Sequence, residues 1–386
     1  MAIITIVDPH EELLKMIESE SDLMTIVGDS TSIRVLQQAN VKKADLVIAV
    51  LHDEHINLLT AILAKKLGAK KVIVRVNTME SLSKESFRIY QDLGIDGIVS
   101  PEDIAAQEII NLLKQNVATE AHDFAGGKLE LLMIKLEPTA IAINKTLEEV
   151  IENYKHIDFR ALAIHRRQNT FIPKANDVFL EGDLVYVITK PHAIKELMEL
   201  SGKEKFNINN AMIVGGSRVG KLTAKRLEDD LNIKIFEMDK ERCFELTNFL
   251  SNTLVINADA RDVDLLEDEG IKDMDAFIAV TDNTETNILT CLQAKSFGVK
   301  RTIALVENID YIDISQNIGI DTIINKKLIA ASYMVRYTLG GNVSSLKCLS
   351  GIDADIVEFV VRDGAAVTNK PINRLDMPEG AIIGGI

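Results

Sequence analysis

The sequence lacks three features that would place the protein in a membrane, in a secretory pathway or on nucleic acid. Its strongest apolar runs, such as Leu46–Leu51, have the length of a strand, far short of the roughly 18 residues that cross a bilayer. The N-terminus soon turns acidic and has no basic segment of the kind that begins a signal peptide. The net charge of −15 offers no basic field to a phosphate polymer, so nucleic-acid binding is not expected.

Cysteine is scarce and poorly spaced for disulfide or metal chemistry. The 3 cysteines, Cys243, Cys291 and Cys348, are odd in number and form no C-x-x-C pair. We therefore expect them to be small, largely buried side chains in a reducing compartment. Together these absences predict a soluble cytoplasmic protein.

The chain contains two copies of one long unit. DLVIAVLHDEHINLLTAILAKKLGAKKVIVRVN, from Asp45, aligns with DAFIAVTDNTETNILTCLQAKSFGVKRTIALVEN, from Asp275. The pairs Asp29/Asp259, Asn57/Asn287 and Gly68/Gly298 keep one constant offset. The similarity continues where INKTLEEV, from Ile143, aligns with TNKPINRL, from Thr368. A register held over so many segments indicates a duplicated architecture.

Each copy has a larger and a smaller part. In the larger part, strand-length apolar segments alternate with helical ones, such as Asn57–Leu67 and a segment near Glu80–Leu93, which predicts parallel βαβ units. The smaller part, around Lys128–Ile188 in the first copy, predicts strands around a helix near Leu147–Asn153. The predicted fold is α/β: two Rossmann-like doubly wound parallel-sheet domains, each followed by a small α+β module.

The predicted boundaries are 1–117 and 118–203 for the first copy, and 208–340 and 341–386 for the second. Asn116–Asp123 ends the first Rossmann part, and the polar stretch 201–210 is the expected linker between the copies. Aligning Asp8 with Glu237 leaves the first copy without the strand and glycine loop that open the second. The last module stops at IIGGI, so we expect a chain trimmed at both ends.

A glycine loop in the second copy has the context of a dinucleotide-binding fingerprint. It follows a predicted strand, Ala211–Val214, and opens a predicted helix, Lys221–Asp229. The first glycine of such a loop makes the tight turn, the second allows the backbone to approach the pyrophosphate, and the third allows the helix to pack on the strand. Here a serine replaces the middle glycine. The loop residues are Gly215, Gly216, Ser217, Arg218, Val219 and Gly220.

Acidic and polar residues end the following strands of the second copy. Glu237 stands at the spacing expected of an acid that accepts a hydrogen bond from the ribose 2′-OH, which favours NAD(H) over NADP(H). Asp239 is a second candidate for that role. Asp259, with Ala260 after it, and Thr281 lie at the carboxyl edge where open α/β sheets bind ligands.

Several of these residues have a structural alternative. Asp259 could contact adenine or cap the next helix. Asn287 could take part in the site, or be a structural cap or an inter-helix bond, and Arg218 could reach a phosphate or point into solvent. In the first copy, Asp8 and Asp29 match Glu237 and Asp259, but no glycine loop precedes them.

Two other patterns are interpreted as structural. His52, Asp53, Glu54 and His55 have metal-ligand chemistry, yet the second copy has no histidine at the matching positions, so a surface loop is favoured. Tyr186 and Lys190 share the Y-x-x-x-K spacing of short-chain dehydrogenases. Since DLVYVIT alternates as a strand, it places the two residues differently from that helical pair.

The segments VGGSRVG, FEMD, NADARD and AVTDNTETN, paired with a second degenerate unit, resemble the TrkA family of Trk-system potassium uptake proteins, which are built from tandem RCK (regulator of potassium conductance) domains. The resemblance implies a nucleotide-sensing subunit, not an enzyme, that lies peripherally on the inner face of the cell membrane. It implies a homo-oligomer, a dimer or tetramer ring, attached to a membrane potassium-translocating subunit of the TrkH/TrkG type. NAD(H) is the expected ligand, with ATP and ADP as the other nucleotides.

Two other functions stay open from the sequence. An NAD-dependent oxidoreductase would need a proton-transfer residue near the nicotinamide, and the segment 117–203 offers only scattered histidines. An RCK-type regulator of another cation channel or antiporter would differ only in its membrane partner.

Overall fold

The computed structural model describes residues 3–20, 23–115, 120–167, 169–202, 206–335, 337, 343–348, 354–378 and 380–386. The predicted boundaries at 117/118, at 203 and at 340/341 fall outside these residues. By its internal contacts the chain forms two compact units. Unit 1 comprises Met1–Pro101 and Ala330–Gly341, and unit 2 comprises Glu102–Ile329 and Asn342–Ile386.

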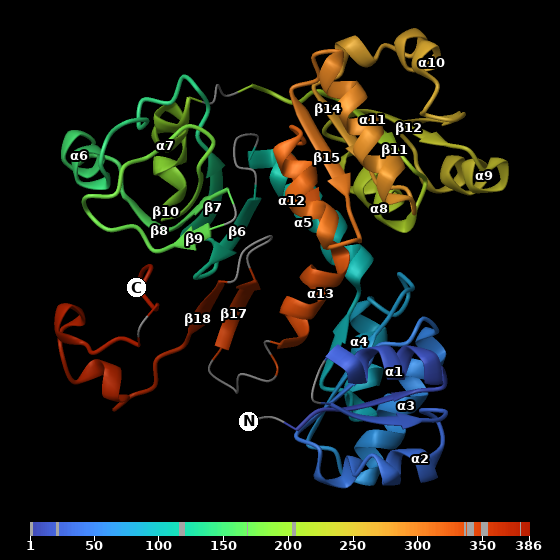
Figure 1. The fold of residues 1–386 in the computed structure, drawn as a ribbon. Coiled ribbons are helices and arrows are strands. Elements are labelled where there is room, and N and C mark those ends of the chain that lie inside the picture. Colours follow the sequence, from blue (N-terminus) through green and yellow to red (C-terminus); the bar gives the residue numbers. More distant parts are fainter. Residues whose placement is uncertain are drawn as a thin grey trace. The chain divides into compact units, whose positions relative to one another are not determined.

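Unit 2 contains a complete Rossmann sheet with helices on both faces (Figure 1). Its six parallel strands run in the order β13-β12-β11-β14-β15-β16. The central strands are buried throughout because helices cover both faces, as in other parallel sheets. The strands are β11 (Asn210–Val214), β12 (Asn232–Glu237), β13 (Thr253–Asn257), β14 (Ala276–Ala279), β15 (Arg301–Leu305) and β16 (Thr322–Ile324). The helices are α8 (Arg218–Leu227), α9 (Lys240–Phe249), α10 (Val263–Asp268), α11 (Thr284–Ser296) and α12 (Asp310–Asn317).

Unit 1 repeats the alternation of strands and helices, but its strands form two separate sheets. β1 pairs with β2, and β3-β4-β5 form a second parallel sheet. In unit 2 the strand β11 joins β12 to β14, whereas no described strand of unit 1 joins β1 to β3. The strands are β1 (Thr5–Asp8), β2 (Met24–Val27), β3 (Leu46–Ala49), β4 (Lys71–Arg75) and β5 (Gly97–Val99). The helices are α1 (Glu11–Glu20), α2 (Ile33–Gln38), α3 (Glu54–Leu67) and α4 (Lys84–Asp92).

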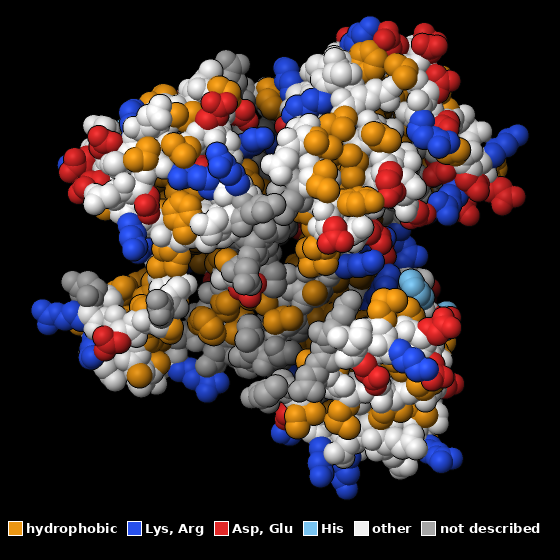
Figure 2. Space-filling model, viewed as in Figure 1, with side chains coloured by type: hydrophobic (Ala, Val, Ile, Leu, Met, Phe, Trp, Pro, Cys, Tyr) orange, Lys and Arg blue, Asp and Glu red, His pale blue; other side chains and the backbone are white. Residues whose placement is uncertain are grey.

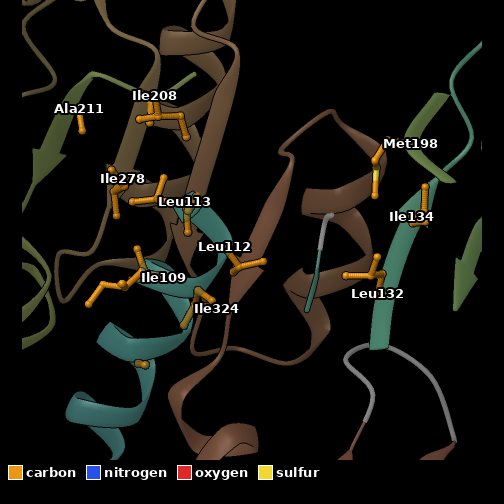
Figure 3. Close-up of a cluster of buried hydrophobic side chains, with 14 of the residues drawn as sticks. Ile109, Leu112, Leu113, Leu132, Ile134, Met198, Ile208, Ala211, Ile278 and Ile324 are labelled. Atoms are coloured by element: carbon orange, nitrogen blue, oxygen red, sulfur yellow. The ribbon is translucent and has the colours of Figure 1, made fainter. Parts of the chain in front are cut away.

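The last helix of each Rossmann copy packs mainly with the other copy. α5 (Pro101–Gln115) belongs to unit 2 from Glu102 onward, and α13 (Lys326–Val335) belongs to unit 1 from Ala330 onward. Figure 3 shows α5 side chains, among them Ile109, Leu112 and Leu113, within one buried cluster. That cluster also contains Ile278 and Ile324 of the second Rossmann sheet and Leu132 and Ile134 of the module. The two copies are therefore exchanged at their last helix.

The small module after α5 is a five-stranded antiparallel sheet in the order β6-β7-β10-β8-β9, with two helices. A capping box between Thr146 and Glu149 fixes the start of α6. We call this part the C module. Its strands are β6 (Glu120–Phe124), β7 (Leu129–Lys135), β8 (Phe159–Arg166), β9 (Asn169–Phe171) and β10 (Leu184–Thr189), and its helices are α6 (Leu147–Asn153) and α7 (Ile194–Ser201).

The C-terminal residues add an antiparallel pair, β17 (Val343–Cys348) and β18 (Asp355–Phe359). Ile356 and Ile382 pack against the C module core around Tyr186, and the Ala125 amide donates to Glu358 Oε1 at 2.9 Å. Short 3-10 turns occur at Val41–Lys43, Pro191–Ala193, Ile271–Asp273, Ala366–Thr368 and Ile372–Arg374.

The predicted α/β fold class is confirmed, with strands and helices close to the predicted segments. Within the described residues, each helix is too short or too polar to cross a membrane. Cys243 and Cys291 are buried free thiols, and the Cys348 side chain is not described.

Candidate functional site

A cleft of about 410 Å³ opens at the carboxyl ends of the central strands of the second Rossmann sheet. This is the edge at which open α/β sheets bind ligands. Its volume lies within the ~300–1,000 Å³ of typical small-molecule sites. It is lined by Val214, Gly215, Ser217, Phe236, Glu237, Met238, Arg242, Ala258, Asp259, Ala260, Arg261, Thr281, Asp282, Asn283 and Thr286.

The turn after β11 requires glycine at two positions. Gly215 has φ +105°, and an added Cβ there would lie 2.8 Å from the Thr281 amide nitrogen. A Cβ at Gly220 would lie 2.2 Å from the Gly215 carbonyl oxygen. The first glycine therefore permits the tight turn and the last permits α8 to pack against it. The N-cap of α8, Ser217, lines the cleft, so the positive end of the helix dipole lies at this side of it.

Ser217 holds the turn in place. Its hydroxyl donates to the Val280 carbonyl oxygen at 2.6 Å. Ser217 Oγ also caps α8, because it accepts from the Gly220 amide at 3.4 Å. The Ser217 hydroxyl is thus bonded to the residue that directly follows β14.

Glu237 is fixed beside the glycine turn. Its side chain is nearly buried, with Oε2 accepting from the Gly216 amide at 2.7 Å and Oε1 accepting from the Asp239 amide at 2.8 Å. Asp239 instead caps α9, where its Oδ1 accepts from the amides of Glu241 and Arg242. Of the two candidate ribose acids, Glu237 lines the cleft and Asp239 does not.

Two arginines at the cleft were not predicted from the sequence. Arg261 donates from Nη2 to Asp259 Oδ2 at 2.6 Å, and these bonds hold the Asp259 pKa below its usual value. Arg242 Nη1 lies 3.9 Å from Asp282 Oδ2. Each arginine follows, by two or three residues, an aspartate that lies two residues after a strand end. That pattern was available in the sequence, but it does not show which way the side chains turn.

Thr281 is held by Asn287, a buried residue on α11. Asn287 Oδ1 accepts from the Thr281 amide at 2.9 Å, and Nδ2 donates to the carbonyl oxygens of Thr281 and Leu305 at 2.9 Å. Asn57 makes the same connections in unit 1, to both backbone groups of Leu51 and to the Arg75 carbonyl oxygen. The repeated asparagine therefore ties the turn before a helix to the neighbouring strand.

Other predicted site residues lie outside this cleft. Arg218 is exposed and does not line it, Val219 is buried in the core, and Gly220 lies beneath the turn. Asp8 and Asp29 belong to unit 1. Asp8 Oδ1 accepts from the His10 amide at 2.8 Å, and Asp29 Oδ1 accepts from the Thr31 amide at 2.8 Å.

The two patterns interpreted as structural have structural partners. Asp53 caps α3, and Glu54 accepts hydrogen bonds from Thr78 and Ser81, including the Thr78 amide at 2.8 Å. In the described part of the chain no three His, Cys, Asp or Glu side chains gather as a metal site would require. Tyr186 is buried in strand β10, and Lys190 forms an ion pair with Asp158.

The cleft has the chemistry of a binding site. A glycine turn at a helix N-terminus suits a diphosphate, the Glu237 carboxylate suits a ribose hydroxyl, and each of the two arginines lies beside a lining aspartate. None of the lining residues is a histidine, lysine, tyrosine or cysteine.

Fold and cleft together define a protein of two Rossmann-type domains with an attached α+β module. Residues 2–101 and 211–326 match the TrkA-N domain family, and residues 131–202 match the TrkA-C domain family. The chain belongs to the TrkA family of Trk-system potassium uptake proteins.

Full-length relatives agree with this assignment. The Trk system potassium uptake protein TrkA of Haemophilus influenzae is 30% identical over 389 residues, which cover 99% of this chain and 85% of the relative. A TrkA homolog of Methanosarcina mazei is 29% identical over 390 residues, covering 98% and 86%. Both relatives are named as potassium uptake proteins and not as oxidoreductases, which agrees with the expectation that the chain is not an enzyme.

Solved structures show the same fold. The GsuK RCK domain superposes with a TM-score of 0.61 at 18% sequence identity, covering 86% of this chain and 70% of that one. A GsuK channel bound to NAD superposes with a TM-score of 0.61 at 17% identity, covering 86% and 59%.

Proposed function

We propose that the second Rossmann domain binds NAD(H) in this cleft and that occupancy gates a membrane potassium-translocating subunit. The observation that carries the proposal is Glu237, held 2.7 Å from the Gly216 amide at the glycine turn. A carboxylate in this position would accept a hydrogen bond from the ribose, beside the helix end that would bind the diphosphate. A GsuK channel of the same fold bound to NAD supports the ligand class, and one bound to ADP keeps ADP and ATP as alternatives.

Gating then requires no bond to be made or broken. A ligand shifts a conformational equilibrium only by binding one conformation more tightly than another. Because the C module shares a buried core with the second Rossmann sheet through α5, a change at the sheet can reach the module. The proposed partner is a TrkH/TrkG-type subunit, contacted from the inner face of the cell membrane.

Isothermal titration of the full chain with NADH, NAD⁺, ADP, ATP and NADPH tests the ligand. Wild type should prefer NADH or NAD⁺ over NADPH because Glu237 repels a 2′-phosphate. In Glu237→Gln the loss of one charged hydrogen bond should weaken NADH binding about tenfold and narrow the gap to NADPH.

Asp239→Asn is the matched control. Asparagine caps a helix as well as aspartate, so α9 should be retained and NADH affinity should stay unchanged. If Asp239→Asn lost NADH affinity and Glu237→Gln kept it, the assignment of the ribose contact to Glu237 would be wrong. No binding of any of the five nucleotides by wild type would refute the proposed ligand class.

Pull-down with a potassium-translocating subunit, with and without NADH, tests the partner. Association that depends on nucleotide supports gating through occupancy. Selective association with an antiporter would instead favour a regulator of another transport system.

A further inference from the structure

A second cavity, of about 260 Å³, lies within unit 2 between the C module and the second Rossmann domain. Lys135, Glu137, His165 and Arg167 line it from the module, and Lys295 and Asp321 line it from the Rossmann side. We call it the junction cavity. It shares no lining residue with the nucleotide cleft.

Strand register sets the module wall. Lys135 at the end of β7 pairs with Leu184 of β10, and Leu184 pairs with His165 of β8. Directly paired residues of antiparallel strands project from the same face, so the three side chains form one row. His165 Nδ1 lies 2.8 Å from Thr170 Oγ1 on β9, which orients the imidazole ring within that row.

The charged side chains of the two walls differ in whether they have hydrogen-bonding partners. The partners of Asp321 lie in its own Rossmann domain. It forms an ion pair with Lys295 and accepts from the Thr302 amide at 2.9 Å and from the Thr302 hydroxyl at 2.8 Å. Lys135 and Arg167 form no side-chain hydrogen bond or ion pair with any residue in the described part of the chain. Asp321 therefore does not neutralise them.

The remaining lining supplies groups that accept hydrogen bonds. The Glu137 carboxylate is also without a side-chain partner among the described residues, and Gln316 and Asn317 line the cavity at the C-terminal end of α12. A helix C-terminus presents carbonyl oxygens and the negative end of its dipole. These groups accept hydrogen bonds, whereas Lys135 and Arg167 donate them.

We propose that the junction cavity binds a small phosphate-bearing metabolite, with the phosphate at Lys135 and Arg167 and hydroxyl or amino groups at Glu137 and the end of α12. Charge-assisted bonds from a lysine and an arginine are the usual means of holding a phosphate. The volume lies below the ~300 Å³ at which typical drug-sized sites begin, which selects a ligand smaller than a dinucleotide. A ligand touching both walls stabilises this arrangement of module and Rossmann domain.

Calorimetric titration of the full chain with ribose 5-phosphate, at ionic strength matched with potassium chloride, tests the proposal. Wild type should give saturable heat that free ribose does not reproduce. Lys135→Gln and Arg167→Asn should each weaken the affinity about tenfold or more. Asparagine suits position 167 because Arg167 has φ +59°, which asparagine tolerates.

Arg242→Gln, at the nucleotide cleft, is the matched control and should leave ribose 5-phosphate binding unchanged. Unchanged affinity in both junction variants would overturn the proposal, as would loss in Arg242→Gln, which would place the phosphate in the nucleotide cleft. Neither result depends on NADH binding. Circular dichroism of each variant shows whether it is folded.

Discussion

At the residue scale, Glu228 illustrates a buried charge with a structural task. Its Oε1 accepts from Lys225 Nζ at 2.6 Å, and Oε2 accepts from the amides of Ser251 and Asn252 at 2.9 Å. Burial by itself would raise the pKa of this carboxyl group, but the hydrogen bonds outweigh burial and hold the pKa below its usual 4.5. The ionised carboxylate thus ties the end of α8 to the start of β13.

Glu228→Gln should lower the free energy of unfolding by about 2 kcal/mol at pH 7. A carboxyl group with a lowered folded-state pKa stabilises the protein fully above the unfolded pKa of about 4.5, and this stabilisation is lost as the pH falls through the folded-state value. The difference between wild type and variant should therefore shrink below about pH 4.5. Urea titrations across this pH range measure it.

Glu245→Gln, at an exposed position on α9, is the control and should change stability by less than about 0.5 kcal/mol at either pH. A pH-independent difference between wild type and Glu228→Gln would show that the charge of Glu228 is not what stabilises the fold.

At the element scale, the sequence predicted where the repeat places its asparagines but not what they do. Asn57 and Asn287 hold matching positions in the two copies, and the alternatives for Asn287 were a structural cap or an inter-helix bond. The structure shows a side chain bonded to its own preceding turn and to the adjacent strand in each copy. Periodicity shows which face a residue occupies, not which backbone groups a short amide reaches.

The cleft arginines were missed for a related reason. Glu237, Asp259 and Thr281 follow from the rule that ligands bind at strand ends, whereas Arg242 and Arg261 lie just inside the next element or turn. Their direction depends on long flexible side chains whose partners, Asp282 and Asp259, are set by local geometry. Sequence pattern alone does not resolve such contacts.

Asn287→Ala should destabilise unit 2 by about 3 kcal/mol, because it leaves the Thr281 amide and two carbonyl oxygens without their partner in a buried site. Asn57→Ala should have an effect of similar size in unit 1. Asn283→Ala removes only the exposed cap of α11 and should cost about 1 kcal/mol. Chemical unfolding followed by circular dichroism compares the three; equal costs for Asn287→Ala and Asn283→Ala would contradict the assigned role.

At the scale of the whole molecule, the exchange of last helices could not be predicted from the sequence. α5 and α13 have apolar faces that would fit their own Rossmann sheet or the other copy's equally well by pattern. Specific contacts accompany the exchange: Arg226 of α8 pairs with Asp103 of α5, and Lys71 donates to the carbonyl oxygen of Tyr337, just after α13, at 3.4 Å. The duplication was readable because register persists along the chain, whereas domain exchange leaves no periodic signal.

The same scale reveals an apolar face that the repeat carries twice. Leu289 on α11, Ile314 on α12 and Ile318 directly after α12 are exposed, and hydrophobic side chains are visible over this part of the surface (Figure 2). Their counterparts in unit 1 are also exposed apolar residues: Leu59 on α3, Ile89 on α4 and Leu93 directly after α4. Clustered exposed apolar side chains are typical of protein interfaces. We infer that these faces join copies of the chain in a homo-oligomer.

Leu289→Glu and Ile314→Glu should each shift the protein to a smaller species, because a buried charge without a partner costs several kcal/mol at an interface. Sedimentation velocity at a fixed protein concentration measures the shift. Phe244→Glu is the matched control: Phe244 is 73% exposed on α9, away from this face, and its replacement should leave the oligomer intact. If Leu289→Glu and Ile314→Glu sediment as wild type does, the oligomer is held by another surface. If Phe244→Glu dissociates as well, added negative charge rather than the α11–α12 face governs assembly.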